Sequence, residues 1–170
     1  MNDIEKYKFK PYDPKFKKLF VVEKRRIKKI LPYAISIEHF GSTSVPGLGG
    51  KGIVDIIILV PQKYFQSSRK KLVENGYRFS EVGSHEERLF FDKNYKYRGK
   101  TRRVHIHLTF EGSNHFEDAL VVREILKSDL KVRRDYVKLK KQASKLCKGD
   151  GKFYRSYKNP FLSGLVKGKK

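Results

Sequence analysis

The residues most able to do chemistry lie in a polar turn between two predicted strands. Gly41 is followed by three hydroxyl residues, Ser42, Thr43 and Ser44, and Lys51 stands at the end of the turn. Glycine lets the backbone approach a ligand closely, hydroxyls and amides can donate to phosphate oxygens, and lysine adds a positive charge. This combination predicts a phosphate-binding turn.

A single carboxylate, Asp55, follows on the next predicted strand. It lies within the very apolar residues 52–60, so we expect it in a strand inside a sheet. An ionised carboxylate there is costly unless a cation compensates it, which makes a divalent ion a natural partner. The alternative is a serine-capped turn in which Asp55 forms an ordinary salt bridge with Lys51 or an arginine.

Two histidines on a later strand could complete such a site. His105 and His107 alternate with apolar residues, so both imidazoles face one side of the strand. Imidazole suits Mn²⁺ or Zn²⁺ better than Mg²⁺. Glu38 could add a carboxylate ahead of the turn, whereas its neighbour His39 points to the opposite face. The alternative for the two strand histidines is a satisfied structural pair or a contact with an anion.

Arg88 begins another predicted strand, where its guanidinium could clamp phosphate oxygens in a bidentate manner. The alternative is a solvated charge on an edge strand. His107 and Thr109 also match once the His-x-Thr motif of phosphoesterases that cleave cyclic phosphates. None of the other histidines has Ser or Thr two residues on, which disfavours that class.

The elements that must position these residues follow from hydrophobic periodicity and turn signals. Helices are predicted over residues 14–31, 62–75, 114–127 and 129–146, and strands over residues 34–40, 52–60, 77–79, 88–91 and 103–110. Residues 93–100 are expected to form a basic loop, residues 153–166 to pack back on the domain, and residues 167–170 to be a frayed basic tail. This pattern predicts an α/β (α+β) fold with a mixed β-sheet flanked by helices.

Composition limits the class of protein. At 170 residues we expect one domain, residues 1–170, and 38% apolar residues exclude a disordered polycation. The chain has 40 Lys and Arg against 18 Asp and Glu, a net charge of +22 that attracts RNA, DNA, nucleotides or acidic membrane surfaces without choosing among them. The alternative is a general bias toward Lys-rich helices.

Cysteine content and hydropathy bear on location. The chain has one cysteine, Cys147, so neither an intrachain disulfide nor a zinc site of paired cysteines is possible. The longest apolar run, residues 56–60, has the length of a strand and is too short to cross a membrane. We therefore expect a cytoplasmic protein with no membrane partner.

The wider string around the turn resembles the GrpB family. It reads Glu-His-x-Gly-Ser-Thr-Ser-Val-Pro-Gly-Leu, then Lys, then Ile-Val-Asp-Ile. The resemblance continues through residues 11–14, 75–77, 88–91, 105–108, 116–120 and 136–140. It implies a divergent nucleotidyltransferase-like fold, in which a serine turn holds nucleotide phosphates and acids on neighbouring strands hold metal ions. Two positions depart from the pattern: Gly52 replaces a proline, and Ile57 replaces the second acid of active transferases.

These observations support two functional hypotheses. The first is metal-dependent nucleotidyl or phosphoryl transfer. In it, the catalytic residues are Asp55, His107 and Lys51, the phosphate-binding residues are Gly41, Ser42, Thr43, Ser44 and Arg88, and the ligands of Mg²⁺, Mn²⁺ or Zn²⁺ are Asp55, His105, His107 and Glu38. The second is a non-catalytic module on the same scaffold that binds a nucleotide or RNA, which Ile57 favours.

Overall fold

The computed structural model describes residues 7–97 and 99–168, which contain a five-stranded sheet in the order β1-β2-β5-β4-β3. Its strands are β1 (Ser36–Phe40), β2 (Ile53–Val60), β3 (Arg78–His85), β4 (Arg88–Tyr97) and β5 (Lys100–Phe110). β2 and β5 run parallel, and the other neighbours are antiparallel. The predicted mixed sheet flanked by helices is confirmed.

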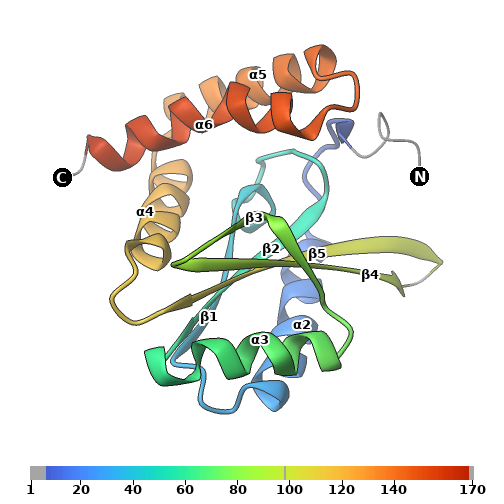
Figure 1. Ribbon diagram of the computed structural model, residues 1–170. Coiled ribbons are helices and arrows are strands. Elements are labelled where there is room, and N and C mark those ends of the chain that lie inside the picture. The colour runs from blue at the N-terminus through green and yellow to red at the C-terminus, as the bar shows by residue number, and fades with distance from the viewer. Residues whose placement is uncertain (1–6, 98, 169–170) are drawn as a thin grey trace.

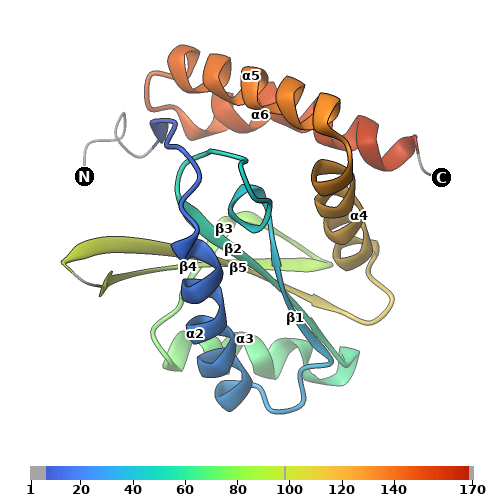
Figure 2. The same ribbon diagram turned by 180° about the vertical axis from the view of Figure 1, so that it is seen from behind.

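Helices lie on both sides of this sheet (Figure 1). They are α2 (Lys15–Ile30), α3 (Phe65–Glu74), α4 (Asn114–Ser128), α5 (Leu130–Leu146) and α6 (Gly151–Lys167). α2 and α3 cover one face, whereas α5 and α6 lie together beyond the other face, with α4 leading up to them; the view from behind shows the same layers (Figure 2). Within the described residues, no helix combines the length and the apolar character that a membrane crossing needs.

Strand register separates a dry face of the sheet from a polar one. Ile56 and Ile58 of β2 and Ile106 of β5 are fully buried in the core beside α2 and α3. The register pairs Asp55 with His105, and alternation turns this pair toward the opposite face. Asp55 and His105 therefore point toward α5 and α6.

The polar turn that joins β1 and β2, residues 41–50, rises from the sheet toward α5 and α6 (Figure 1). We call it the serine turn. Val45 and Leu48 are buried from solvent and pack in one cluster with Leu126 of α4 and Tyr136 of α5. Apolar packing from above thus fixes a turn whose lower side meets the polar face of the sheet.

Two segments differ from the expectation drawn from the sequence. The expected basic loop over residues 93–100 is largely strand, because β4 continues to Tyr97 and β5 begins at Lys100. Lysines are common on the exposed strands of a hairpin, so a segment rich in lysine can be a strand although its charge suggests a loop. The C-terminal segment is the helix α6, with Asp150 as its N-cap and Pro160 inside it. The expected basic tail begins at the last residue of α6, and residues 169–170 lie outside the described part.

A buried polar contact fastens α2 to the strand side of the core. Glu23 is fully buried, and its carboxylate accepts a hydrogen bond of 2.5 Å from Tyr77 Oη. The Arg26 guanidinium donates to the other carboxylate oxygen at 2.7 Å. Burial and the neighbouring Glu23 charge raise the pKa of Tyr77, so the phenol remains a donor.

We predict that Tyr77→Phe lowers the free energy of unfolding by about 1–3 kcal/mol, because a buried carboxylate loses one of its donors. Urea unfolding measures this. Tyr157→Phe is the matched control, since the Tyr157 hydroxyl makes a long, exposed hydrogen bond of 3.4 Å to Gln142. Equal losses in the two variants would contradict the role given to Glu23.

Candidate phosphate site

Asp55 and His105 form a hydrogen-bonded pair on the polar face of the sheet. Asp55 Oδ1 lies 3.2 Å from His105 Nδ1, and the two side chains are 22% and 20% exposed, so solvent reaches both. Burial alone would raise the pKa of Asp55, but the hydrogen bond from His105 and the electrostatic interactions with His105, His107 and Lys51 bring that pKa below its usual value. The carboxylate is therefore ionised, and it fixes Nδ1 of the imidazole as a donor.

Gly41 brings the serine turn into direct contact with this carboxylate. Its φ of +68° and ψ of −170° belong to a region of backbone conformation that is almost restricted to glycine. A Cβ atom at position 41 would lie 2.5 Å from Asp55 Oδ2. The absence of a side chain at this position is thus what allows the turn to sit on Asp55.

Ser42 and Lys140 meet on the same side of the turn. A Cβ atom at Gly50 would lie 2.5 Å from Ser42 Oγ and 2.6 Å from Lys140 Nζ, so both polar atoms line one spot. Lys140, on α5, is only 3% exposed, and its ammonium group donates to the Gly49 carbonyl. Burial lowers the pKa of Lys140 to about 7, with Lys158 and Lys51 acting in the same direction and Asp55 against them.

Further cations surround the acid. Lys51 Nζ lies over the rings of Tyr7 and Tyr154, at 4.7 and 5.0 Å from their centroids. Lys158 of α6 is half-buried, and the charge of Asp55 opposes the lowering of its pKa by burial. We call the residues that interact in this way the Asp55 cluster. They are Asp55, His105, His107, Lys51, Lys140 and Lys158.

His107 and Arg88 lie at the β4 side of the cluster. The imidazole of His107 packs edge-on against Phe40 and Phe90, with ring centroids 4.9 and 5.2 Å apart. Burial, together with the charge of Arg88, lowers the pKa of His107 to about 3. The Arg88 guanidinium donates to the Gly83 carbonyl at 3.1 Å, and its buried Nε has no hydrogen-bond partner among the described residues. His107 is therefore neutral at physiological pH.

Other predicted site residues lie on the opposite side of the serine turn. Glu38 accepts from Arg123 Nη1 at 2.8 Å instead of approaching Asp55. Thr43 Oγ1 donates to the Ile53 carbonyl at 2.8 Å, so it must accept the bond of 2.9 Å that it shares with His39 Nε2. The hydroxyl of Ser44 donates from Oγ to the Gly41 carbonyl at 2.7 Å. The structure thus divides the predicted phosphate-binding and metal-binding residues between two places.

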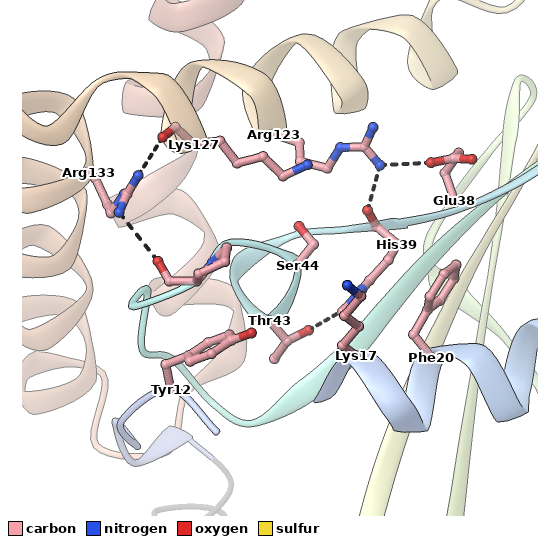
Figure 3. A pocket seen from close by; sticks show the side chains of 11 residues that line it. Tyr12, Lys17, Phe20, Glu38, His39, Thr43, Ser44, Arg123, Lys127 and Arg133 are labelled. Carbon is pink, nitrogen blue, oxygen red and sulfur yellow. Dashed lines mark hydrogen bonds and ion pairs between the residues drawn. The ribbon is translucent and has the colours of Figure 1, made fainter. Parts of the chain in front are cut away.

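A cavity of about 520 Å³ occupies this second place (Figure 3). It lies between α2, the serine turn and α4, and we call it the α2–α4 cavity. Four of its lining residues are the cations Lys17, Arg123, Lys127 and Arg133. None of the six residues of the Asp55 cluster lines this cavity, so the cavity is separate from the cluster.

The donor set of the Asp55 cluster does not fit a metal ion by itself. Over residues 7–97 and 99–168, no three His, Cys, Asp or Glu side chains are grouped so that they could hold one. Asp55 and His105 supply two donor atoms, and the ammonium groups of Lys51, Lys140 and Lys158 disfavour a dication. Mg²⁺ commonly completes its shell with substrate phosphates and water, so a metal here needs ligands that the chain does not supply.

Sequence reasoning missed Lys140 and Lys158. Lys140 stands four residues after Tyr136 and three before Ala143, so a lysine interrupts the apolar stripe of α5. A charged residue on such a stripe is the signal that could have identified it. Lys158 gave no comparable signal, because α6 was not predicted as a helix.

The mixed sheet and its flanking helices form a nucleotidyltransferase-like fold. The Cid1 poly(U) polymerase, in a crystal structure with MgGTP bound, superposes with a TM-score of 0.54 at 18% identity. The match covers 81% of this chain and 44% of the Cid1 chain, so this chain spans less than half of that length. At this identity the likeness shows the fold alone.

Within this class the chain belongs to the GrpB family, whose profile, described as GrpB protein, matches residues 6–167. The crystal structure of GrpB from Enterococcus faecalis has a TM-score of 0.79 at 24% identity, with 95% of this chain and 96% of that chain covered. The UPF0157 protein BH1888 from Halalkalibacterium halodurans is 29% identical over 160 residues, which are 92% of this chain and 78% of BH1888. The resemblance noted in the sequence is confirmed.

We predict that Gly41→Ala destabilises the protein by about 1–3 kcal/mol more than Gly47→Ala does, because only the first Cβ would collide with Asp55. Gly47 is a matched control. Its φ is also positive, at +79°, but a Cβ there would meet nothing within 4 Å. Chemical unfolding of both variants isolates the contact, and equal losses would show that the turn does not rest on Asp55.

We also predict that His39 makes stability depend on pH. Burial lowers its pKa from 6.5 to about 4, so the unfolded chain binds the proton first as pH falls. Stability should be complete above pH 6.5 and decrease toward pH 4, with His39 contributing a loss of about 2 kcal/mol between pH 7 and pH 5. His39→Gln should reduce the wild-type loss by that amount in urea unfolding at the two pH values. An unchanged loss would show that His39 is not buried in its neutral form.

Proposed function

We propose that the Asp55 cluster binds the phosphate groups of a nucleotide or of another phosphate compound. The observation that carries this proposal is that one ionised carboxylate, Asp55, interacts electrostatically with the side chains of Lys51, Lys140 and Lys158, and that the Lys140 amine meets Ser42 Oγ and the Gly49 carbonyl at the serine turn. Such a site has an excess of positive charge that a phosphate would neutralise. The hydroxyl of Ser42 beside Lys140 adds a donor at the same spot.

The same arrangement supports nucleotidyl or phosphoryl transfer as the chemistry. His105 donates from Nδ1 to Asp55, so the tautomer that can act as a base carries its lone pair on Nε2. In the proposed step, the oxygen of an acceptor hydroxyl forms a bond to phosphorus and its proton passes to Nε2. The bond to the leaving phosphate oxygen breaks, and that oxygen keeps the electron pair. Asp55 stabilises the resulting imidazolium.

In this proposal, Mg²⁺ or Mn²⁺ enters with the phosphates of the ligand, because Nε2 of His105 takes the proton and the cluster then supplies only the carboxylate of Asp55. The ion would neutralise phosphate charge when bound. Lys140 and Lys158 act on the same charge from the helical side of the site. We therefore expect metal to strengthen nucleotide binding and Lys140 to contribute in its absence.

We predict that isothermal titration calorimetry with ATP, UTP and inorganic triphosphate detects binding that Lys140→Met weakens about tenfold, the loss expected for one charged contact. Ser42→Ala should also weaken binding, though by less. Titrations with and without Mg²⁺ measure the contribution of the metal. Methionine keeps the length of the buried side chain and removes its charge.

Lys138→Met is the matched control, since Lys138 lies exposed on the same helix and the variant has the same net charge. An absence of heat with all three ligands, or equal weakening by the two variants, would refute the proposal.

The net charge of +22 supports a second candidate, a non-catalytic module that binds RNA. In that case, RNA affinity should fall steeply with salt and should respond equally to Lys138→Met and Lys140→Met.

A further inference from the structure

The α2–α4 cavity has the charge and construction of a second anion site, one that shares no side chain with the Asp55 cluster. Cations reach it from three elements: Lys17 from α2, Arg123 and Lys127 from α4, and Arg133 from α5 (Figure 3). Two carboxylates, those of Glu38 and Glu124, accept hydrogen bonds from this group. Four positive charges against two leave an excess of positive charge around the cavity.

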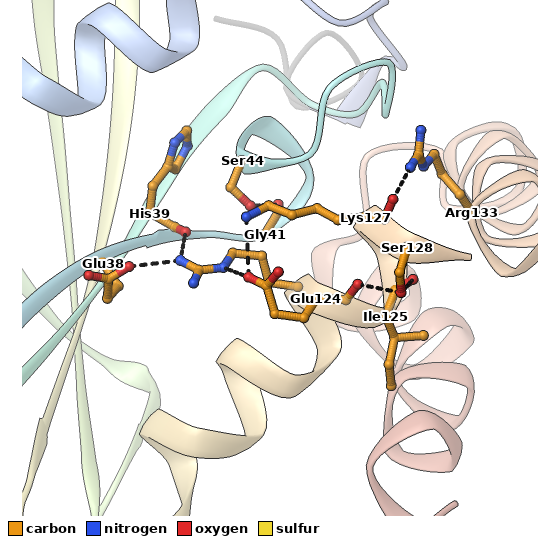
Figure 4. Close-up of polar contacts among 10 residues, drawn as sticks. Glu38, His39, Gly41, Ser44, Glu124, Ile125, Lys127, Ser128 and Arg133 are labelled. Atoms are coloured by element: carbon orange, nitrogen blue, oxygen red, sulfur yellow. Dashed lines mark hydrogen bonds and ion pairs between the residues drawn. The ribbon is translucent and has the colours of Figure 1, made fainter. Parts of the chain in front are cut away.

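Arg133 links two sides of the cavity, α4 and the serine turn, through hydrogen bonds to neutral carbonyl groups. Its guanidinium donates to the carbonyls of Leu126 and Lys127, at the end of α4, at 2.8 and 2.5 Å. A third bond, of 3.3 Å, goes to the Pro46 carbonyl in the serine turn. All three partners are neutral, so Arg133 fixes the turn against α4 and its positive charge is not compensated by a carboxylate in these bonds. Figure 4 shows the bond to the Lys127 carbonyl.

Lysines in the cavity keep donors for a ligand. No hydrogen bond or ion pair involves Lys17 within the described part of the chain, and Lys127 uses one contact, of 3.2 Å, to Glu124. The hydroxyls of Thr43 and Ser44 already donate to backbone carbonyls, so charge and not hydroxyl donation dominates this site.

Arg123 connects the cavity to β1. Its Nη1 donates to the Glu38 carboxylate at 2.8 Å and to the His39 carbonyl at 2.9 Å, and its Nε donates to Glu124 at 2.8 Å. Among the described residues, no hydrogen bond uses Nη2 of Arg123, so its N–H groups can donate to a ligand. Glu38 therefore competes with any incoming anion for the guanidinium.

We propose that the α2–α4 cavity binds a small phosphorylated molecule through Lys17, Arg123 and Lys127, independently of the Asp55 cluster. A phosphate monoester offers three terminal oxygens to donors that approach from several directions, whereas a carboxylate offers two. The volume of about 520 Å³ leaves room for an organic body. Tyr12 and Phe20, which line the same cavity, provide aromatic surface for it.

The test is an NMR titration of the protein with phenyl phosphate, with inorganic phosphate and benzoate as comparison ligands. We expect saturable shifts of the backbone amides of Ser44, Arg123 and Lys127, with phenyl phosphate binding more tightly than either comparison ligand. Lys17→Gln and Lys127→Gln should each weaken binding about tenfold. Glu38→Gln should strengthen it, because the carboxylate no longer competes for Arg123.

Lys131→Gln is the matched control, since it removes one positive charge from a side chain on α5 that is 83% exposed. Equal weakening by Lys131→Gln would show diffuse attraction to the basic surface and would overturn the proposal. Loss of phenyl phosphate binding in Lys140→Met would also overturn it, because the ligand would then occupy the Asp55 cluster. Binding that depends on Lys17 and Lys127 supports the second site even if no nucleotide binds at the Asp55 cluster.

Discussion

The close contact between Gly41 and Asp55 is the constraint on which both polar sites depend. It places a carboxylate directly beneath the serine turn, where a side chain at position 41 would collide with Asp55 Oδ2. The same carboxylate holds His105 and opposes the lowering of pKa at Lys140 and Lys158. Without this negative charge, several cations would face one another across a partly buried space, which is costly.

Ile57 explains why the charge balance of the cluster differs from that of a two-acid site. It lies two residues beyond Asp55 on the same face of β2 and is only 1% exposed. A carboxylate there would be buried as deeply and would need a compensating cation. The chain has an apolar side chain at this position and brings lysines from α5 and α6 to the acid. This composition suits an anion better than a resident dication.

Sequence periodicity predicted most of the fold, because the apolar run of β2, the alternation of β5 and the apolar stripes of α2 and α5 are local signals. Periodicity did not predict α6, because a proline such as Pro160 normally argues against a helix. It also did not predict the strand over residues 93–97, because their charge suggested a loop. For the candidate site, alternation along two strands was enough to place Asp55 and His105 on one face. The contribution of Lys140 depends on how α5 folds back over the sheet, which no local pattern specifies.

The serine turn lies between two basic regions and contributes residues to both. Its first residues, Gly41 and Ser42, face the Asp55 cluster, while Thr43 and Ser44 line the α2–α4 cavity. Thr43 lies between the two regions. Its side chain is buried, and its hydroxyl links His39 to the Ile53 carbonyl at the start of β2. A ligand in the α2–α4 cavity would contact the same short turn that rests on Asp55. One short turn therefore contributes residues to two basic regions that share no side chain.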